Sequence, residues 1–184
     1  MKVALIGMGS VGRGVAHVLK NDSRFKIVAA ADSKSGTVNQ EGLDIERLLQ
    51  AKKDTGRIGT PDWTAFRISA EVDYDVLVEV TPTNAETGEP ALSTIKIALS
   101  RGKHVVTSNK GPISLYYREL ESLAEENGVA LRFEGTVAGA VPIINGIRNG
   151  LAGNKVKALF GVLNGTCNYI LSRMEEEGLT YTQA

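Results

Sequence analysis

From the N-terminus to Phe133, short apolar segments alternate with amphipathic ones. Apolar runs bounded by turns are typical of buried strands, whereas apolar residues spaced three and four apart are typical of helices. The pattern predicts strands at residues 3–6, Phe25–Ala31, Val76–Thr81, His104–Thr107 and Val129–Phe133, and helices at Ser10–Asn21, Leu43–Lys53, Leu92–Ser100 and Leu115–Asn127. This alternation indicates an α/β fold around a doubly wound parallel sheet.

The alternation stops after Phe133, where the chain becomes glycine-rich and irregular as far as Pro142. Beyond that point the pattern predicts a helix at Ile143–Arg148, a strand at Lys155–Leu163, a helix at Cys167–Glu177 and the start of another helix at Thr180. We therefore expect one domain at residues 1–133 and the beginning of a second at residues 134–184. Because the chain stops one turn into its last predicted helix, we expect it to be truncated or an expressed fragment.

A glycine turn follows the first predicted strand and opens the first predicted helix. Its sequence is Gly7-Met8-Gly9-Ser10-Val11-Gly12, the spacing of a Rossmann dinucleotide-binding turn. In such a turn Gly7 permits the sharp bend, Gly9 lets backbone amides approach a pyrophosphate, and Gly12 lets the helix pack on the strand. The phosphates would lie at the helix N-terminus, where free N–H groups favour negative charge. In this helix we expect Val11, Val15, Val18 and Leu19 near one face.

Asp32 ends the second predicted strand, 20 residues beyond Gly12. An acidic residue at this distance usually binds the adenosine ribose hydroxyls, and the alternative is an aspartate that caps the turn in Ala31–Gly36. Ser33 and Lys34 follow it and are expected beside the same ribose. A carboxylate alone repels a 2′-phosphate, but Lys34, with Arg13 nearby, could neutralise one. NAD and NADP therefore both remain open.

Polar residues also follow the third and fourth predicted strands, at the edge of the sheet where a cofactor binds. Thr81, Pro82 and Asn84 follow one strand and are expected near the nicotinamide or its ribose. Ser108, Asn109 and Lys110 follow the next strand.

Composition narrows the function classes. The 184 residues are 42% hydrophobic and 23% charged, with 21 basic and 21 acidic side chains, so nothing indicates a nucleic-acid or membrane partner. No apolar run is long enough to cross a bilayer, and a strand that begins at residue 2 or 3 leaves no room for a signal peptide. A single cysteine excludes an intrachain disulfide and fits a cytoplasmic location.

Three stretches carry a resemblance to a known family. They are GKHVVTSNKGPIS (Gly102–Ser114), FEGTVAGAVPII (Phe133–Ile144) and LNGTCNYIL (Leu163–Leu171). Behind the glycine turn, their order and spacing resemble those of homoserine dehydrogenase. The resemblance implies an NAD(P)-dependent oxidoreductase that interconverts L-homoserine and L-aspartate 4-semialdehyde, in the branch leading to threonine and methionine. It also implies a homodimer formed through the second domain, whose beginning would be residues 134–184.

The resemblance implies roles for particular residues. Lys110 matches the lysine beside the nicotinamide and substrate, for which a part in proton transfer is proposed; a base or a positive charge there would assist hydride transfer. The alternative for Lys110 is a surface lysine after a strand. Ser108 would lie at the cofactor beside it. A monovalent cation, sodium or potassium, would be held largely by backbone carbonyls of Glu134, Val137, Gly139 and Val141. Without the resemblance this glycine-rich loop would be interpreted as a hinge.

Other polar residues have no partner pattern. His17 and His104 lack further ligands at metal spacing and are expected to be structural, and Cys167 is expected to pack in the fold. Asn164, Gly165 and Thr166 could contact the substrate or the nicotinamide carboxamide.

Two alternative functions remain from the sequence. One is another Rossmann enzyme, such as an amino-acid dehydrogenase or a reductase of the dihydrodipicolinate type. The other is a non-catalytic NAD(P)-binding regulatory module. In the resembling family the substrate domain continues beyond the LNGTCNYIL stretch, so we expect the 184-residue chain to bind cofactor but to have little or no turnover.

Overall fold

The computed structural model describes residues 1–184, which form two compact units, Met1–Thr136 and Val137–Ala184. Unit 1 contains the sheet and its covering helices, and unit 2 contains only helical segments and irregular chain.

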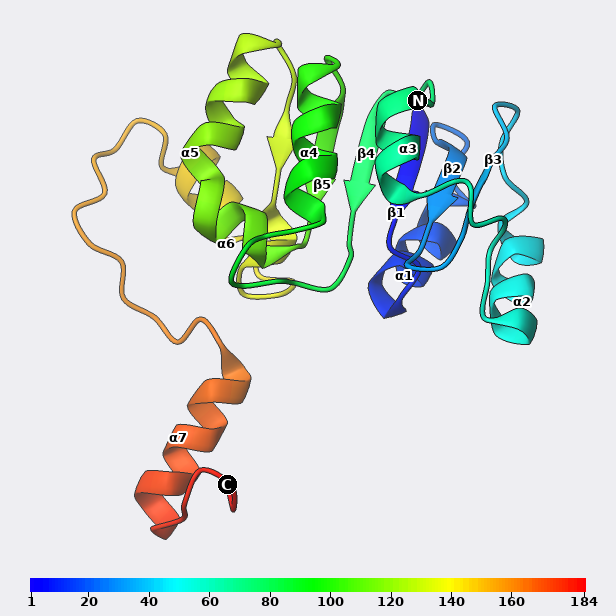
Figure 1. The fold of residues 1–184 in the computed structure, drawn as a ribbon. Coiled ribbons are helices and arrows are strands. Elements are labelled where there is room, and N and C mark those ends of the chain that lie inside the picture. The colour runs from blue at the N-terminus through cyan, green and yellow to red at the C-terminus, as the bar shows by residue number, and fades with distance from the viewer. The chain divides into compact units, whose positions relative to one another are not determined.

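Unit 1 is built on a six-stranded sheet with the order β3-β2-β1-β4-β5-β6 (Figure 1). The strands are β1 (Lys2–Ile6), β2 (Lys26–Ala31), β3 (Gly36–Val38), β4 (Val76–Glu79), β5 (His104–Thr107) and β6 (Leu131–Arg132). All neighbouring strands are parallel except β3, which runs antiparallel to β2. The predicted α/β fold with a doubly wound, mainly parallel sheet is therefore confirmed, and β3 is an addition that the pattern did not predict.

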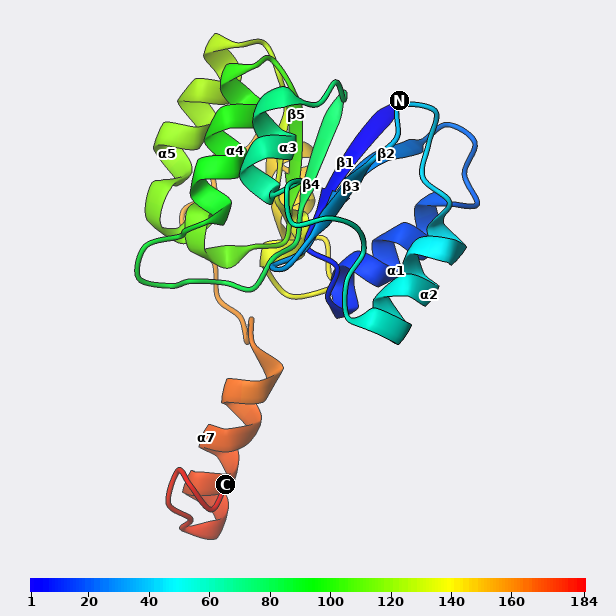
Figure 2. The ribbon, with the colours of Figure 1, turned by 45° about the vertical axis from the view of Figure 1, so that its right-hand side comes forward.

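Helices cover both faces of this sheet. They are α1 (Ser10–Leu19), α2 (Ile45–Thr55), α3 (Ala65–Glu71), α4 (Ala91–Ser100) and α5 (Lys110–Glu126). Helices α3, α4 and α5 lie side by side on one face, and α1 and α2 lie on the other (Figure 2). Helix α3 was not predicted. Helix α5 begins at Lys110 rather than Leu115 and is kinked at Tyr116, where φ is −132° and ψ is 21°.

Local signals explain most helix ends. Asp44, Thr64 and Asn109 are the N-caps of α2, α3 and α5, and each accepts a hydrogen bond from a backbone N–H in the first turn. Gly102 and Gly128 follow α4 and α5 and adopt φ values of +68° and +65°, the left-handed conformation in which glycine commonly ends a helix.

The core between α1, α2 and the sheet shows which face of α1 is buried. Gly12 and Ala16 are buried, and Val15 and Leu19 pack partly against the same core. Val11 and Val18 are 54% and 71% exposed, so the prediction that they share an inward face with Val15 and Leu19 was wrong. The small residues Gly12 and Ala16 let the helix axis approach the sheet closely, and this choice of contact face turns the larger valines outward.

Unit 2 contains α6 (Ile143–Asn145), the π-helical turn η2 (Gly146–Gly150) and α7 (Gly165–Glu177). The predicted strand at Lys155–Leu163 was wrong, because residues 155–164 form neither helix nor strand. A strand needs a neighbouring strand for its backbone hydrogen bonds, and no segment of the described chain pairs with this one. Its side chains are exposed, Phe160 to 92%. After α7 the chain forms a turn at residues 181–183 instead of the predicted helix. None of the helices in the structure combines the length and apolarity needed to cross a membrane.

Candidate cofactor-binding site

The turn after β1 depends on two glycines for its shape. Gly7 adopts φ +104°, and a Cβ placed on it would lie 2.7 Å from the carbonyl carbon of Val80. A Cβ on Gly12 would lie 1.8 Å from the carbonyl oxygen of Gly7. Any side chain at Gly12 would therefore push α1 away from the turn, which supports the packing role predicted for this glycine.

Gly9 is different, because a Cβ there would meet no protein atom within 4 Å. Gly9 is also the N-cap of α1; no side chain caps this helix, and its first turn contains no acidic residue. The exposed residues Ser10 and Val11 thus begin a helix whose N-terminal N–H groups have no side-chain cap. This arrangement fits the pyrophosphate of a dinucleotide.

The turns after β1, β2 and β4 meet at one edge of the sheet. Gly7 N–H donates to Ala31 O at 2.8 Å, and Val80 N–H donates to Ile6 O at 2.8 Å. Strand order reverses here, since β1 is followed by β2 on one side and β4 lies on its other side. In doubly wound sheets a dinucleotide binds across this switch point, with one mononucleotide on each half.

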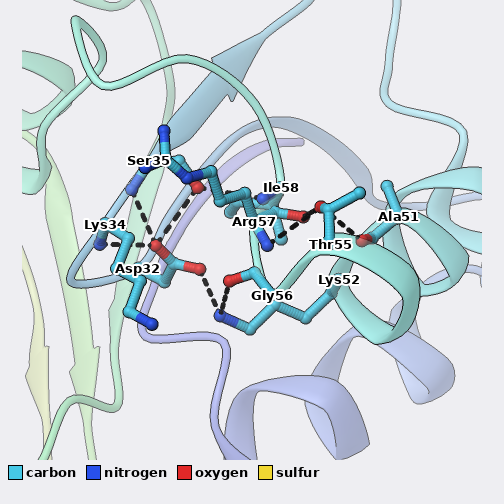
Figure 3. Close-up of polar contacts among 9 residues, drawn as sticks. All are labelled: Asp32, Lys34, Ser35, Ala51, Lys52, Thr55, Gly56, Arg57 and Ile58. Atoms are coloured by element: carbon cyan, nitrogen blue, oxygen red, sulfur yellow. Dashed lines mark hydrogen bonds and ion pairs between the residues drawn. The ribbon is translucent and has the colours of Figure 1, made fainter.

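Asp32, directly after β2, is held inside its own loop (Figure 3). Its Oδ1 accepts hydrogen bonds from Lys34 N–H at 2.7 Å and Ser35 N–H at 2.8 Å, and Ser35 Oγ lies at 3.3 Å. The turn-capping alternative is thus present in the structure. Whether the carboxylate also binds a ribose hydroxyl stays a prediction.

The other carboxylate oxygen of Asp32 faces a residue that sequence reasoning missed. Lys52 reaches from α2 and places its Nζ 2.5 Å from Asp32 Oδ2 and 3.0 Å from Gly56 O (Figure 3). Burial raises the pKa of Asp32, but the hydrogen bonds from Lys52, Lys34 and Ser35 outweigh it, so the net shift is downward. Lys52 lies 20 positions from Asp32, and only the fold brings the two together.

The loops after β4 and β5 are joined through Asn109. Its Nδ2 donates to Thr81 O and Thr81 Oγ1, both at 3.2 Å, and its Oδ1 accepts from Gly111 N–H at 3.2 Å. Thr81 and Asn109 are largely shielded, whereas Pro82 is exposed. The structure thus brings the predicted residues Thr81, Pro82 and Asn109 together.

Lys110 follows Asn109 as the first residue of α5 and is exposed, while its backbone N–H donates to Thr83 Oγ1 at 3.3 Å. Ser108, on the other side of Asn109, is half-buried, and its backbone N–H donates to Glu79 O at 3.3 Å. Both therefore lie at the carboxyl end of β5, where the sequence placed them.

Glu79 is the second site residue that sequence reasoning missed. It ends β4 inside an apolar run and its side chain is completely buried. Burial raises the pKa of Glu79, and hydrogen bonds from Thr81 and Thr107 oppose that rise. An acidic residue in a strand of otherwise apolar residues was the available signal, because a buried carboxylate needs hydrogen-bond donors around it.

The predicted cation loop spans the boundary between the units. Glu134 lies in the 3₁₀ turn η1 (Glu134–Thr136) of unit 1. Val137, Gly139 and Val141 belong to unit 2, where Ala138 and Gly139 adopt φ values of +52° and +59°. The irregular backbone that was expected is present, and a cation bound by these carbonyls stays a prediction.

The remaining candidates behave as structural or surface groups. His104 Nδ1 accepts a hydrogen bond from Ala130 N–H at 3.0 Å. The described chain contains no group of three or more His, Cys, Asp or Glu side chains that could hold a metal. Cys167 is exposed in α7, so the expected packing role is absent from this structure; the cysteine faces outward because α7 has no buried side. Asn164 caps α7 by accepting from Cys167 N–H at 2.9 Å, and Gly165 and Thr166 form its first turn.

Comparison with protein-family models gives two matches. Residues 7–134 match the model described as homoserine dehydrogenase, NAD binding domain, and residues 142–184 match the homoserine dehydrogenase model. The chain belongs to the homoserine dehydrogenase family. This assignment confirms the resemblance and sets aside the alternative of another Rossmann amino-acid dehydrogenase.

This chain matches only part of the length of individual family members. The homoserine dehydrogenase of Methanocaldococcus jannaschii is 43% identical, over all of this chain and 59% of its own length. The crystal structure of a putative homoserine dehydrogenase from Archaeoglobus fulgidus has a TM-score of 0.87 at 41% identity, over all of this chain and 57% of that one. A hyperthermophilic archaeal homoserine dehydrogenase in complex with NADPH has a TM-score of 0.84 at 30% identity, over 99% of this chain and 58% of that one. The chain therefore spans somewhat more than half the length of these relatives.

Proposed function

We propose that this chain is the cofactor-binding half of an enzyme that interconverts L-homoserine and L-aspartate 4-semialdehyde with NAD(P). The observation that carries the proposal is the uncapped N-terminus of α1, which opens at the switch point of the sheet. Across that point lie Thr81 and the Asn109–Lys110 pair at the start of α5. Dinucleotide binding in other proteins uses this same arrangement.

We propose that the adenosine half of the cofactor lies over β1 and β2. Gly7, Gly9, Ser10, Val11 and Gly12 would contact the pyrophosphate, and Asp32, Ser33 and Lys34 the ribose. The carboxylate of Asp32 favours ribose hydroxyls, whereas Lys52 partly neutralises it and Lys34 adds positive charge to the same loop. This pairing of charges supports the use of both NAD and NADP.

We propose that the nicotinamide half lies over β4 and β5, beside Thr81, Pro82, Ser108 and Lys110. The bound cofactor accepts or returns the hydride. Lys110 is exposed at the N-terminus of α5, where its ammonium group can polarise the aldehyde oxygen, or its deprotonated, neutral amine can accept the hydroxyl proton of the alcohol. The hydrogen bond of Asn109 to Thr81 O and that of Lys110 N–H to Thr83 Oγ1 hold the backbone of Lys110 in place for either role.

The remaining expectations belong to the whole enzyme. We propose that residues 134–184 begin the substrate and dimerisation domain, and that the enzyme acts as a cytoplasmic homodimer in threonine and methionine biosynthesis. Sodium or potassium would bind backbone carbonyls of Glu134, Val137, Gly139 and Val141. Oxygen donors suit such hard cations, and the successive left-handed residues Ala138 and Gly139 can turn carbonyls toward one point.

The proposal is tested by titrating the chain separately with NADH and NADPH, with and without homoserine. We expect fluorescence titration to show binding of both cofactors and little steady-state turnover, because the matched region is 59% of the M. jannaschii relative. Homoserine or aspartate semialdehyde should alter cofactor affinity if Lys110 borders a substrate site. Cofactor binding that ignores both compounds would favour the regulatory module, and no binding of either cofactor would refute the proposal.

A further inference from the structure

Glu79 is a buried acid that hydride transfer does not require. It ends β4 and is fully buried. A buried carboxylate is strongly unfavourable unless donors surround it. The donors that surround Glu79 come from Thr81, which follows β4, and from Thr107, which ends β5.

Two hydrogen-bond chains connect Asn109 to the two oxygens of Glu79. Along the first, Asn109 N–H donates to Thr107 Oγ1 at 2.9 Å, and Thr107 Oγ1 donates to Glu79 Oε2 at 3.3 Å. Along the second, Asn109 Nδ2 donates to Thr81 Oγ1 at 3.2 Å, and Thr81 Oγ1 donates to Glu79 Oε1. Thr81 N–H also donates to Oε1, at 2.9 Å.

The direction of both chains is determined by the carboxylate. Each threonine hydroxyl has one proton; it accepts from Asn109 and donates that proton to Glu79. A group that donates in place of one carboxylate oxygen would oppose the hydroxyl that faces it. Glu79 and Thr107 are also direct partners in the register of β4 and β5, so this connection crosses the sheet at its carboxyl edge.

We infer that Glu79 is a positioning residue that fixes the nicotinamide half of the cofactor site through Thr81, Thr107 and Asn109. The inference rests on the proposed function, which puts the nicotinamide over β4 and β5. Asn109 connects the Glu79 hydrogen bonds to the start of α5, because it caps this helix and directly precedes Lys110. The adenosine half, formed by the turn after β1 and the Asp32 loop, shares none of these hydrogen bonds.

The test compares two probes of the full chain: NADH, and ADP-ribose, which lacks the nicotinamide. In Glu79→Gln, the amide keeps the size of the side chain but replaces one acceptor with a donor. We expect NADH affinity to fall about tenfold, as when a hydrogen bond to a charged group is lost, and ADP-ribose affinity to stay within about twofold.

A matched control separates positioning from general loss of stability. Thr94 in α4 is 2% exposed, and its hydroxyl bonds only to Ala91 O of its own helix, at 2.9 Å. Thr94→Val should leave the affinity for both probes unchanged. If Glu79→Gln does not fold, Thr107→Val should give the same selective loss of NADH affinity, and Thr107→Ser should restore it.

The outcomes distinguish failure of the positioning role of Glu79 from failure of the proposed cofactor-binding function. Equal loss for both probes, or no loss for either, would overturn the positioning role while leaving the cofactor site intact. NADH that binds wild-type protein no more tightly than ADP-ribose would also count against it. Failure of the wild-type chain to bind either probe would instead reject the proposed function.

Discussion

Lys52 and Asp32 form a shielded ion pair that connects α2 to the end of β2, with 2.5 Å between Nζ and Oδ2. The Asp32 side chain is only 6% exposed, and its other oxygen is occupied by the amides of its own loop. The negative charge of Asp32, the residue predicted to bind the adenosine ribose, is therefore partly neutralised by a lysine from another element.

Removal of Lys52 should change cofactor preference. Without its charge, Asp32 repels a 2′-phosphate more strongly, so Lys52→Met should weaken NADPH binding about tenfold, close to 1.4 kcal/mol, and alter NADH binding much less. Parallel fluorescence titrations measure the ratio of the two dissociation constants. Lys53→Met removes the same charge from an exposed position of α2 and should leave that ratio unchanged. A ratio that shifts equally in both variants would show that net charge alone is responsible.

The same pair predicts how stability depends on pH. The folded-state pKa of Asp32 is lowered from its ordinary 3.8, so the folded state favours the ionised form. Its stabilisation is complete above the ordinary pKa and is lost as the pH falls below about 4 toward the folded-state pKa. Denaturant unfolding between pH 3 and 7 should show a steeper acid loss of unfolding free energy for wild type than for Asp32→Asn, which cannot ionise. Parallel curves for the two proteins would contradict the prediction.

Two glycines in α1 should respond oppositely to alanine. Gly12→Ala places a Cβ 1.8 Å from Gly7 O and should lower the unfolding free energy by about 3 kcal/mol, at the upper end for overpacking. A Cβ at Gly14, also in α1, meets nothing within 4 Å, so Gly14→Ala should raise stability by up to about 1 kcal/mol. Chemical denaturation measures both values. Similar effects at the two positions would mean that α1 does not depend on its close contact with the turn.

Gly9 offers a test of the phosphate position that is independent of folding. Because no protein atom lies near its Cβ position, Gly9→Ala should melt within about 2 °C of wild type, in line with a surface substitution. Its NADH and ADP-ribose affinities should both fall, since the methyl group would occupy space needed by the pyrophosphate. Unchanged affinity for both would place the phosphates elsewhere.

The exposed segment 155–164 should promote self-association. Phe160 is 92% exposed within it, and contiguous exposed apolar chain favours intermolecular pairing. Phe160→Asp should therefore lower the apparent mass in concentration-dependent light scattering. Phe66 on α3, 59% exposed in unit 1, provides the control: Phe66→Asp should leave the association unchanged. Loss of association in both variants would show that the effect is not specific to residues 155–164.

The sequence was most informative where periodicity and turn chemistry coincide. Strands β1, β2 and β5 and the glycine turn could be predicted, because apolar runs and glycine spacing are local signals. Strand β3 could not, since Gly36–Val38 is too short to show a period. The first turn of α5 was missed because Gly111 and Pro112 are typical of loops, although Asn109 caps the helix there.

The candidate site was predictable only where all the residues that make one contact lie in a single segment. Gly7, Gly9 and Gly12 lie in one turn, so their roles followed from spacing. Lys52 and Glu79 act through partners on other elements, and no local pattern contains both members of such a pair. The three stretches that carry the family resemblance compensated for part of this, by indicating Lys110.

Strand β3 also determines where the sheet can grow. Gly36 exchanges two backbone hydrogen bonds with Thr60, at 2.8 and 2.9 Å, along the outer side of β3, and a Cβ on Gly36 would lie 1.9 Å from Trp63 O. The loop at residues 58–63 thus occupies the backbone groups of Gly36 that a further strand would have to pair with. An added strand, from an engineered fusion or another chain, would have to displace this loop to pair along β3.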